Sequence, residues 1–377
     1  MGQLGKRVNL VHELRQLAGS EELAHSSYHR TGVNQLAGGN SFDLAHRHTV
    51  FGVALHAQQT DAELTLHQFA YQLNAAVGQA VDVVGVCVPV LFHAEVALAA
   101  IEAGKHVLIE KPLTLTLTEA DGLIEHARRS SAKVMVGFNL RWHRLVRQAR
   151  DVIQQGGLGS PTLMRTVLTS YHEDVPEWRK RRELGGGVLF ELAVHHFDLW
   201  RFLLQSEVEE VFATSHSGQW EDEAATVTAR MANGVCVVSV FSERTSESHE
   251  VEVYSRAGCL QVSCHRFDGL EYFSPTGFPG DVRSRLRKVA HTLKELPQGL
   301  WGMRGGGDFI ASYQAEWRHF IDAIRRDTPV ECTLEDGRHA LQVVLAAAAS
   351  ASLRQPITVD RAPRKVTSIG VVASGKG

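Results

Sequence analysis

The first strong hydrophobic pattern in the chain is an almost unbroken apolar run from Val81 to Val88. Its residues are mostly β-branched, which is typical of a parallel strand buried on both faces. Pro89 ends the run. The pattern over Ala94–Ala103 then predicts a helix, which Gly104 closes just beyond its last turn. A buried strand followed directly by a helix is the start of a βαβ unit.

The same alternation continues along the chain. His106–Ile109 and Val134–Phe138 predict short buried strands, and Thr118–Arg129 predicts a helix between them, capped by Thr118 with Asp121 three residues later. Such crossovers build a parallel, doubly wound sheet, so we expect an α/β Rossmann-like N-terminal domain. Ligands of these sheets bind at the carboxyl ends of the strands. Those ends lie at Pro89, Glu110–Pro112 and Asn139–Arg141.

After a predicted helix at Val146–Gln155, the pattern changes to strand-like segments separated by turn signals. We therefore expect domains at 1–142 and 143–377, the second an α+β domain with an open, mainly antiparallel sheet. Phe278–Gly307 is rich in Gly and Arg and predicts a loop with one short helix. The predicted strands are Leu163–Ser170, Glu209–His216, Ala224–Met231, Val235–Glu243, Glu250–Ser255, Cys259–Cys264 and Gly269–Phe273. The predicted helices are Val194–Leu204, Phe309–Arg326 and Leu334–Leu353.

Residues 1–80 differ from the rest of the chain. Weak periodicity there indicates helices at Leu10–Leu17 and Leu64–Val77 and a strand at Thr49–Leu55. No G-x-G-x-x-G turn, the usual cradle for a dinucleotide pyrophosphate, occurs anywhere in the chain. Two explanations stay open: a diverged half-domain that has lost cofactor binding, or a segment that is not the native reading of the gene.

Composition narrows the class of partner. The 377 residues carry a net charge of −3, which argues against nucleic acid as the main partner. Five cysteines without a C-x-x-C pair indicate a reduced, cytoplasmic protein rather than a disulfide framework. The N-terminus has no apolar core of a signal peptide, and no apolar run is long enough to span a bilayer, so we expect no membrane partner.

Two groups of residues are candidates for chemistry. Lys111 follows a buried strand at the ligand edge of the sheet, where its ammonium can donate to a substrate oxygen. Beside it, Glu110 can accept from a ribose hydroxyl, and Pro112 fixes the chain direction and is a candidate for a cis bond. Further along, Glu191 and His195 are four residues apart, so on a helix they share a face and can act as a carboxylate and general base.

The segment before that helix contains Gly185, Gly186 and Gly187, which would let backbone approach a ligand closely. A metal site is the competing interpretation for the histidines, but no set has the spacing of a known motif, and we expect no metal. The sets considered for zinc are His195, His196 and Asp198, His25 and His29, His46 and His48, and Cys259 and Cys264.

Several motifs follow one another in a fixed order between about Val81 and Leu204. They are Val88-Pro89-x-x-x-His93, Ala103–Val107 leading into Glu110–Leu113, Gly137–Arg141, Trp178-Arg179 and Gly185–Asp198. Because these motifs occur together in this order, the chain resembles the Gfo/Idh/MocA family of NAD(P)-dependent oxidoreductases. This family includes glucose–fructose oxidoreductase and inositol dehydrogenase.

The resemblance implies roles for individual residues. It implies that Lys111 and His195 are catalytic and that Glu191 supports His195. Glu191 stands where the family usually has Asp, and Ala193 stands where it often has Gly. The cofactor-binding residues that it implies are Val88, Pro89, Leu91, His93, Glu110, Lys111, Asn139, Trp178 and Arg179.

The function implied by the resemblance is hydride transfer between NAD or NADP and a secondary alcohol or ketone of a sugar, inositol or related polyol. The family also implies a homodimer or homotetramer that packs through the open sheet. The alternative is a non-catalytic relative that binds a ligand or acts as a scaffold and has lost cofactor binding. The missing phosphate glycines and the Glu191 exchange favour this alternative.

Overall fold

The computed structural model describes residues 50–54, 82–277, 281–303 and 306–359. Within these ranges the strand expected near Thr49–Leu55 is confirmed as β1 (Val50–Ala54). The helices expected at Leu10–Leu17 and Leu64–Val77 lie outside the described residues.

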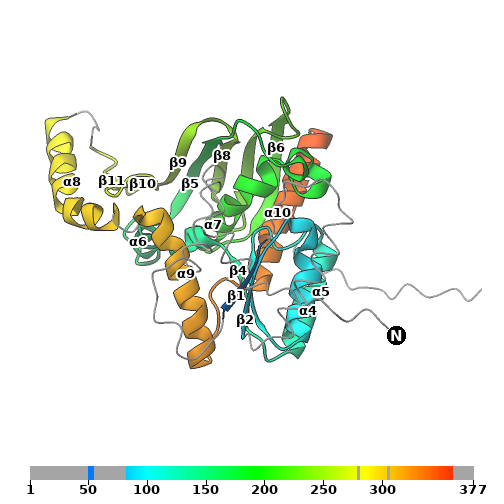
Figure 1. Ribbon diagram of the computed structural model, residues 1–377. Helices are drawn as coiled ribbons and strands as arrows, with labels where there is room; N and C mark the ends of the chain where they lie inside the picture. Colours follow the sequence, from blue (N-terminus) through cyan, green and yellow to red (C-terminus); the bar gives the residue numbers. More distant parts are fainter. Residues whose placement is uncertain (1–49, 55–81, 278–280, 304–305, 360–377) are drawn as a thin grey trace, which may run out of the picture.

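The described residues form a parallel sheet of four strands as the first layer, in the order β1-β2-β3-β4. Its strands are short and their residues are almost all buried, as expected for a sheet covered on both faces. Figure 1 shows α4 and α5 beside one face of this sheet and α9 on the opposite side. The elements of this part are β2 (Val83–Cys87), η2 (Val90–Phe92), α4 (His93–Glu102), β3 (His106–Glu110), α5 (Leu117–Arg129), β4 (Val134–Gly137) and η3 (Asn139–Trp142).

The start of α5 differs from the prediction. The N-cap is Thr116, whose side chain accepts from the backbone of Glu119, while the Glu119 carboxylate accepts from the Thr116 backbone N–H. Expecting Thr118 and Asp121 in these positions was wrong. The longer glutamate side chain reaches back over one turn and closes a full capping box.

The second sheet has eight strands in the order β11-β10-β9-β5-β8-β7-β6-β12. It is open and mainly antiparallel, as predicted, but it is not a simple meander, because β5 and β8 at its centre run parallel. The strand expected at Glu250–Ser255 begins earlier, at Arg244, and pairs along its length with β5. The strands are β5 (Pro161–Tyr171), β6 (Val208–His216), β7 (Ala224–Met231), β8 (Cys236–Ser242), β9 (Arg244–Ser255), β10 (Gly258–Ser263), β11 (Leu270–Phe273) and β12 (Ile357–Thr358).

The expectation of a loop with one short helix at Phe278–Gly307 was wrong. Helix α8 occupies 22 residues of this segment and continues through Pro297. Its glycines and arginines concealed an apolar repeat with helical spacing. The remaining helical elements are α6 (Arg144–Gln154), η4 (Glu177–Lys180), η5 (Arg182–Leu184), η6 (Leu189–Ala193), α7 (Val194–Leu204), α8 (Val282–Met303), α9 (Gly307–Arg326) and α10 (Leu334–Leu353).

The last helices return to the first sheet. The carbonyl of Cys332, between α9 and α10, accepts from the backbone N–H of Val136 on β4 at 3.0 Å. A buried guanidinium, Arg141, joins the two domains, because it donates to both carboxylate oxygens of Asp198 and to Asp336. The two sheets are therefore held in one orientation by groups buried at their junction.

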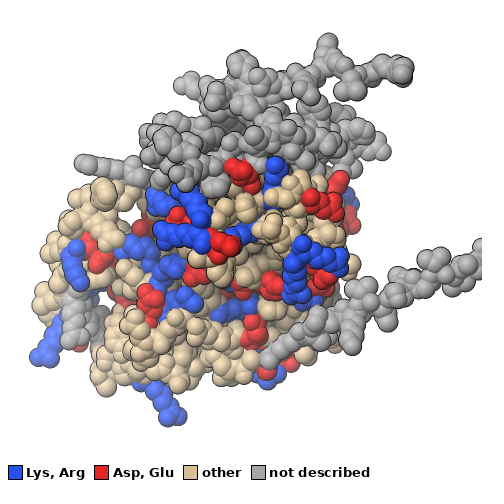
Figure 2. Space-filling model, turned by 90° about the horizontal axis from the view of Figure 1, so that it is seen from below, with Lys and Arg blue, Asp and Glu red and all other residues tan. Residues whose placement is uncertain are grey.

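Charges are mixed over the surface. On the face in Figure 2, blue Lys and Arg side chains alternate with red Asp and Glu over the body of the molecule. This agrees with the net charge of −3. No helix in the described part of the chain has the length and apolar character needed to cross a membrane.

Candidate active site

The carboxyl end of β3 places Lys111 at the junction of the two domains. Its side chain is buried, which an ammonium tolerates only with partners. Both partners belong to Glu191 of the second domain: Nζ donates to the Glu191 carbonyl oxygen at 2.8 Å and lies 3.5 Å from its carboxylate. The peptide bond between Lys111 and Pro112 is cis, as considered from the sequence. The preceding residue, Glu110, is half-buried, and its carboxylate accepts from the Lys111 backbone N–H at 3.3 Å.

The Glu191 carboxylate is shared between two cations. Arg179 lies 3.6 Å from it and also pairs with Glu243, which is fully buried. Burial opposes the charge of Arg179, but Glu191 and Glu243 outweigh it and raise the pKa of this guanidinium. Burial, and then the charge of Glu191, raise the pKa of Glu243, which also accepts from Trp220. The result is a buried network of two cations, Lys111 and Arg179, and two acids, Glu191 and Glu243.

Glu191 therefore has neighbours that the sequence did not indicate. It lies in η6, where the helix is wound more loosely than an α-helix, just before α7. His195 follows at the second position of α7 and is half-buried. The ion pairs of Glu191 are with Lys111 and Arg179. Orientation of His195 by Glu191 stays a prediction.

The glycines before η6 allow close contact between parts of the protein. A Cβ on Gly186 would lie 2.2 Å from the backbone oxygen of Arg179, and a Cβ on Gly185 would lie 2.2 Å from Val90 beyond the end of β2. Gly185 also has a φ of +85°, in the region that favours glycine. These two glycines approach the protein's own chain, where the sequence had suggested approach to a ligand.

The described residues that were considered as metal ligands contact other protein groups and are not arranged around a common point. Asp198 is bound by Arg141, and the imidazole of His196 is fully buried against Phe241 and His249. Among the described residues, no group of three His, Cys, Asp or Glu is arranged to hold a metal ion. All five cysteines are free thiols. The histidines at 25, 29, 46 and 48 lie outside the described residues.

The loop after β2 holds the next group of predicted cofactor residues. Val88 and Pro89 are buried, and Leu91 is half-buried. His93 is buried with its two ring nitrogens 2.8 and 2.9 Å from the carbonyl oxygens of Val88 and Pro112. Its ring therefore joins the loops that follow β2 and β3. Burial lowers the pKa of His93, and the contacts of its ring with the backbone carbonyls oppose this shift.

Helix α9 contributes residues that sequence reasoning missed. Asn139 is buried and donates to Ser312 at 3.1 Å. One turn along α9, Glu316 is fully buried, and neither carboxylate oxygen has a hydrogen-bond partner. Burial, and then the charge of Glu110, raise the pKa of Glu316 well above its usual range. The available signal was a glutamate on the apolar face of an amphipathic helix, four residues before Phe320.

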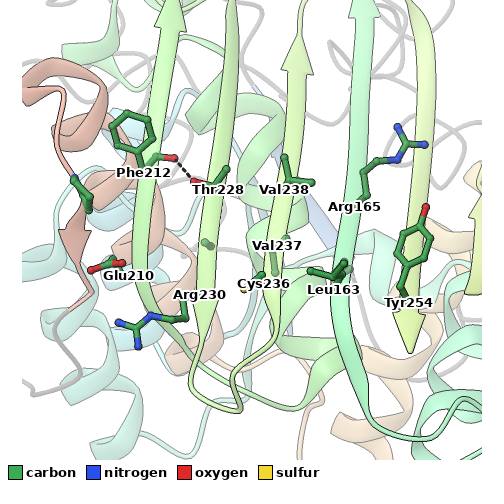
Figure 3. Close-up of a pocket in the computed structure, with 13 residues that line it drawn as sticks. Leu163, Arg165, Glu210, Phe212, Thr228, Arg230, Cys236, Val237, Val238 and Tyr254 are labelled. Carbon is green, nitrogen blue, oxygen red and sulfur yellow. Dashed lines mark hydrogen bonds between the residues drawn. The ribbon is translucent and has the colours of Figure 1, made fainter. Parts of the chain in front are cut away.

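A groove lies elsewhere on the molecule. It has a volume of about 630 Å³, it lies on the outer face of the large sheet, and neither Lys111 nor Glu191 lines it. Figure 3 shows side chains from β5 to β9 lining it. They include Leu163, Arg165, Glu210, Phe212, Arg230, Val238 and Tyr254. We place the candidate active site at the Lys111 network, because the chemistry-bearing groups converge there.

Comparison with known proteins gives two family models that match in sequence order. Residues 37–138 match the oxidoreductase family with an NAD-binding Rossmann fold, and residues 146–261 match the GFO/IDH/MocA C-terminal domain. The chain is 28% identical over 293 residues to myo-inositol 2-dehydrogenase of Thermotoga maritima, covering 74% of this chain and 80% of that protein. It is 27% identical over 296 residues to levoglucosan dehydrogenase of Pseudarthrobacter phenanthrenivorans, covering 68% and 74% of the two chains.

A solved structure supports the fold. Levoglucosan dehydrogenase in complex with NADH and levoglucosan superposes with a TM-score of 0.64 at 19% identity, covering 83% of this chain and 90% of that one. At this identity the likeness concerns the fold alone.

Proposed function

Because the chain belongs to the GFO/IDH/MocA family of oxidoreductases, we propose that it transfers hydride between NAD(P) and a secondary alcohol or ketone of a sugar, inositol or related polyol. One observation carries the proposal. A buried lysine at the carboxyl end of a parallel strand meets, from the other domain, a carboxylate and an arginine. This is the edge at which such sheets bind ligands.

The residues present fit a bound nicotinamide cofactor. Trp178 and Arg179 each carry a buried N–H, at Nε1 and Nε respectively, that has no acceptor among the described residues. A buried donor without an acceptor is costly, so an acceptor on a bound molecule would stabilise both. Gly137, at the end of β4, lies against Glu110, because a Cβ there would be in van der Waals contact with the Glu110 carboxyl carbon at 3.4 Å. Glu110, Lys111, Asn139, Trp178 and Arg179 would therefore hold the nicotinamide side.

In the oxidative direction we propose that Lys111 binds and polarises the substrate hydroxyl. An ammonium has three N–H groups, and Glu191 occupies two directions around Nζ, which leaves one for the alcohol oxygen. The positive charge stabilises the oxygen as its proton leaves. His195 takes that proton as general base. A bound nicotinamide supplies the hydride acceptor.

Glu191 and Arg179 set the charge around Lys111 in this scheme. Glu191 contacts the lysine ammonium and positions it, while Arg179, itself held by Glu243, contacts the Glu191 carboxylate and fixes it in place. The extra methylene of Glu191, compared with the usual Asp, gives it the reach to contact both cations. We therefore propose that the exchange is compatible with activity.

The outer face of the large sheet is where we propose that two copies of the chain associate, as a homodimer or as part of a homotetramer. Leu163, Val238 and Val240 are exposed there, and such contiguous apolar surface is typical of an interface. Arg230 and Glu210 lie on the same face and would pair across a two-fold axis. The five free thiols support a cytoplasmic location.

Titration of the full chain with NADH and NADPH, followed by nicotinamide fluorescence, tests the proposed function. We expect micromolar binding of at least one cofactor and at least ten-fold weaker binding in Lys111→Ala. Lys105→Ala, before the opposite end of the same strand, is the matched control and should bind normally. A screen of polyols and sugars with the preferred cofactor then identifies the substrate.

Absence of binding of either cofactor up to millimolar concentration would sink the dehydrogenase proposal and favour the non-catalytic alternative. An equal loss of cofactor binding in both lysine variants would contradict the proposal that Lys111 contacts the cofactor.

A further inference from the structure

Helix α8 carries an apolar stripe that no described residue covers. The stripe is formed by Val282, Leu286, Val289, Leu293, Leu296 and Leu300, which are between 39% and 72% exposed. Their spacing alternates between four and three residues, so at about 100° per residue they fall within a sector of about 80°. Trp301 adjoins this stripe and is 73% exposed. Six aligned apolar side chains facing water are costly unless they have a partner.

The contacts of α8 with the protein use another side of the helix. Thr292 donates to Asp268, and Glu295 pairs with Arg144. Gly299 lies so close to Phe267 that a Cβ would meet its ring at 2.6 Å. Around the helix axis, these positions lie on average about 100° from the centre of the apolar stripe. Figure 1 shows α8 at one extremity of the molecule, far from α4 and α5. The helix is therefore anchored through that side, and none of the described residues covers its stripe.

The charges along α8 select the kind of partner. The helix contains five basic residues and one acidic residue, in a chain whose net charge is −3. The acidic one, Glu295, is used in the pair with Arg144. Arg285 borders the stripe on one side, and Arg283 and Lys294 follow its other side. A partner must therefore be apolar along its centre and anionic along both edges.

A second α8 does not meet this requirement. Alternating four and three spacing also suits a coiled coil, but pairing two such helices would bring Arg283, Arg285 and Lys294 towards their equivalents without acidic partners. The surface of a bilayer with anionic lipids does meet it, because acyl chains accept the stripe and head groups accept the flanking cations. Long basic side chains can reach outward from the edge of the buried face.

We propose that α8 is an interfacial helix by which this protein binds the surface of membranes that contain anionic lipids. The helix would lie in the plane of the interface with its apolar stripe inserted and Trp301 at the head-group level. This departs from the expectation of no membrane partner, which rested on the absence of a signal-peptide core and of an apolar run long enough to span a bilayer. Helix α9, which holds Ser312 against Asn139, follows α8 directly, so the bound surface would lie close in sequence to the candidate active site.

Flotation with vesicles tests the proposal on the full chain, without cofactor or substrate, so its result is independent of the proposed reaction. The vesicles are phosphatidylcholine alone, or phosphatidylcholine with 30% phosphatidylglycerol (about a third of the lipid, enough for a strongly negative surface). We expect binding to the anionic vesicles, at least ten-fold weaker binding to neutral ones, and loss of binding as salt is raised.

Three variants locate the binding surface. The double variant Leu286→Gln with Leu293→Gln should lose at least ten-fold in binding, and Arg283→Gln with Lys294→Gln should lose the preference for anionic lipid. Leu353→Gln, an exposed leucine at the end of α10, is the matched control and should bind as the parent does. All replaced side chains are exposed, and circular dichroism checks that each variant is folded.

Equal flotation of the parent and the stripe variant would overturn the proposal. So would a stripe-dependent change in oligomeric mass by analytical ultracentrifugation without vesicles, because the stripe would then belong to a contact between copies of the chain.

Discussion

Replacing His196 by leucine should make the protein less sensitive to acid. His196 is fully buried on α7, with its ring 5.5 Å from that of Phe241 and 5.2 Å from that of His249. Neither of its ring nitrogens has a hydrogen-bond partner. Burial lowers its pKa from 6.5 to about 3. The folded protein therefore keeps this ring neutral at pH values where an unfolded chain would protonate it.

The sign and size of the effect follow from proton linkage. Below pH 6.5 the unfolded state takes up a proton that the folded state refuses until about pH 3, so the free energy of unfolding falls as the pH falls through this window. Each pH unit corresponds to about 1.4 kcal/mol, so this one histidine should cost about 2 kcal/mol between pH 7 and pH 5. His196→Leu removes that cost, while His249, whose pKa is also lowered by burial, keeps its own contribution.

Urea denaturation followed by tryptophan fluorescence measures this at pH 7, 6 and 5, at constant ionic strength and protein concentration. The variant should lose about 2 kcal/mol less than the parent between pH 7 and pH 5. His216→Leu, which removes an exposed imidazole from β6, is the control for the loss of one histidine. Parallel pH dependences in the parent and His196→Leu would refute the reasoning, since they would mean that His196 is protonated or solvated in the folded state.

Three further substitutions test other parts of the structure. Glu191→Gln leaves two buried cations without this carboxylate and should lower the free energy of unfolding by about 3 kcal/mol, measured by urea denaturation at pH 7, whereas Glu191→Asp should lose less because it retains the charge. Gly186→Ala places a Cβ against the Arg179 carbonyl and should destabilise the protein by about 2 kcal/mol, while Gly122→Ala, in open space on α5, should not; thermal unfolding of the two variants side by side decides this. Glu316 has a raised pKa, so its stabilising contribution is complete below about pH 4.5 and is lost as the pH rises. The free energy of unfolding of Glu316→Gln should therefore rise relative to that of the parent between pH 5 and pH 8, and a constant difference between the two would contradict this.

Most elements of the fold could be predicted because their signals are local. The apolar run at β2 and the periodicity of α4 and α10 involve neighbours within one or two turns of chain, and the structure confirms all three. Helix α8 was missed for the opposite reason. Its apolar face is regular, but the segment is rich in Gly and Arg and contains Pro297, so composition pointed to a loop.

The candidate site was predictable only in part. The position of Lys111 follows from strand order, because the end of a buried parallel strand is also the ligand edge of the sheet. Its partner Glu191 is 80 residues away, and nothing in the local pattern says that the two meet. Glu316 is even further from Lys111 in the sequence. The sequence shows only an acidic residue on the apolar face of a helix, and its complete burial is seen only in the structure.

By itself, the sequence determined the two layers of this protein, the order of its strands and helices in the first domain, and the motifs that mark its family. These depend on hydrophobic periodicity and on turn chemistry, which act over a few residues. Only the tertiary structure decided which charges share the interior around Lys111, that β5 and β8 run parallel, and that α8 presents its apolar stripe to water. Each of these depends on contacts between distant segments, whose energies appear only when the chain is packed.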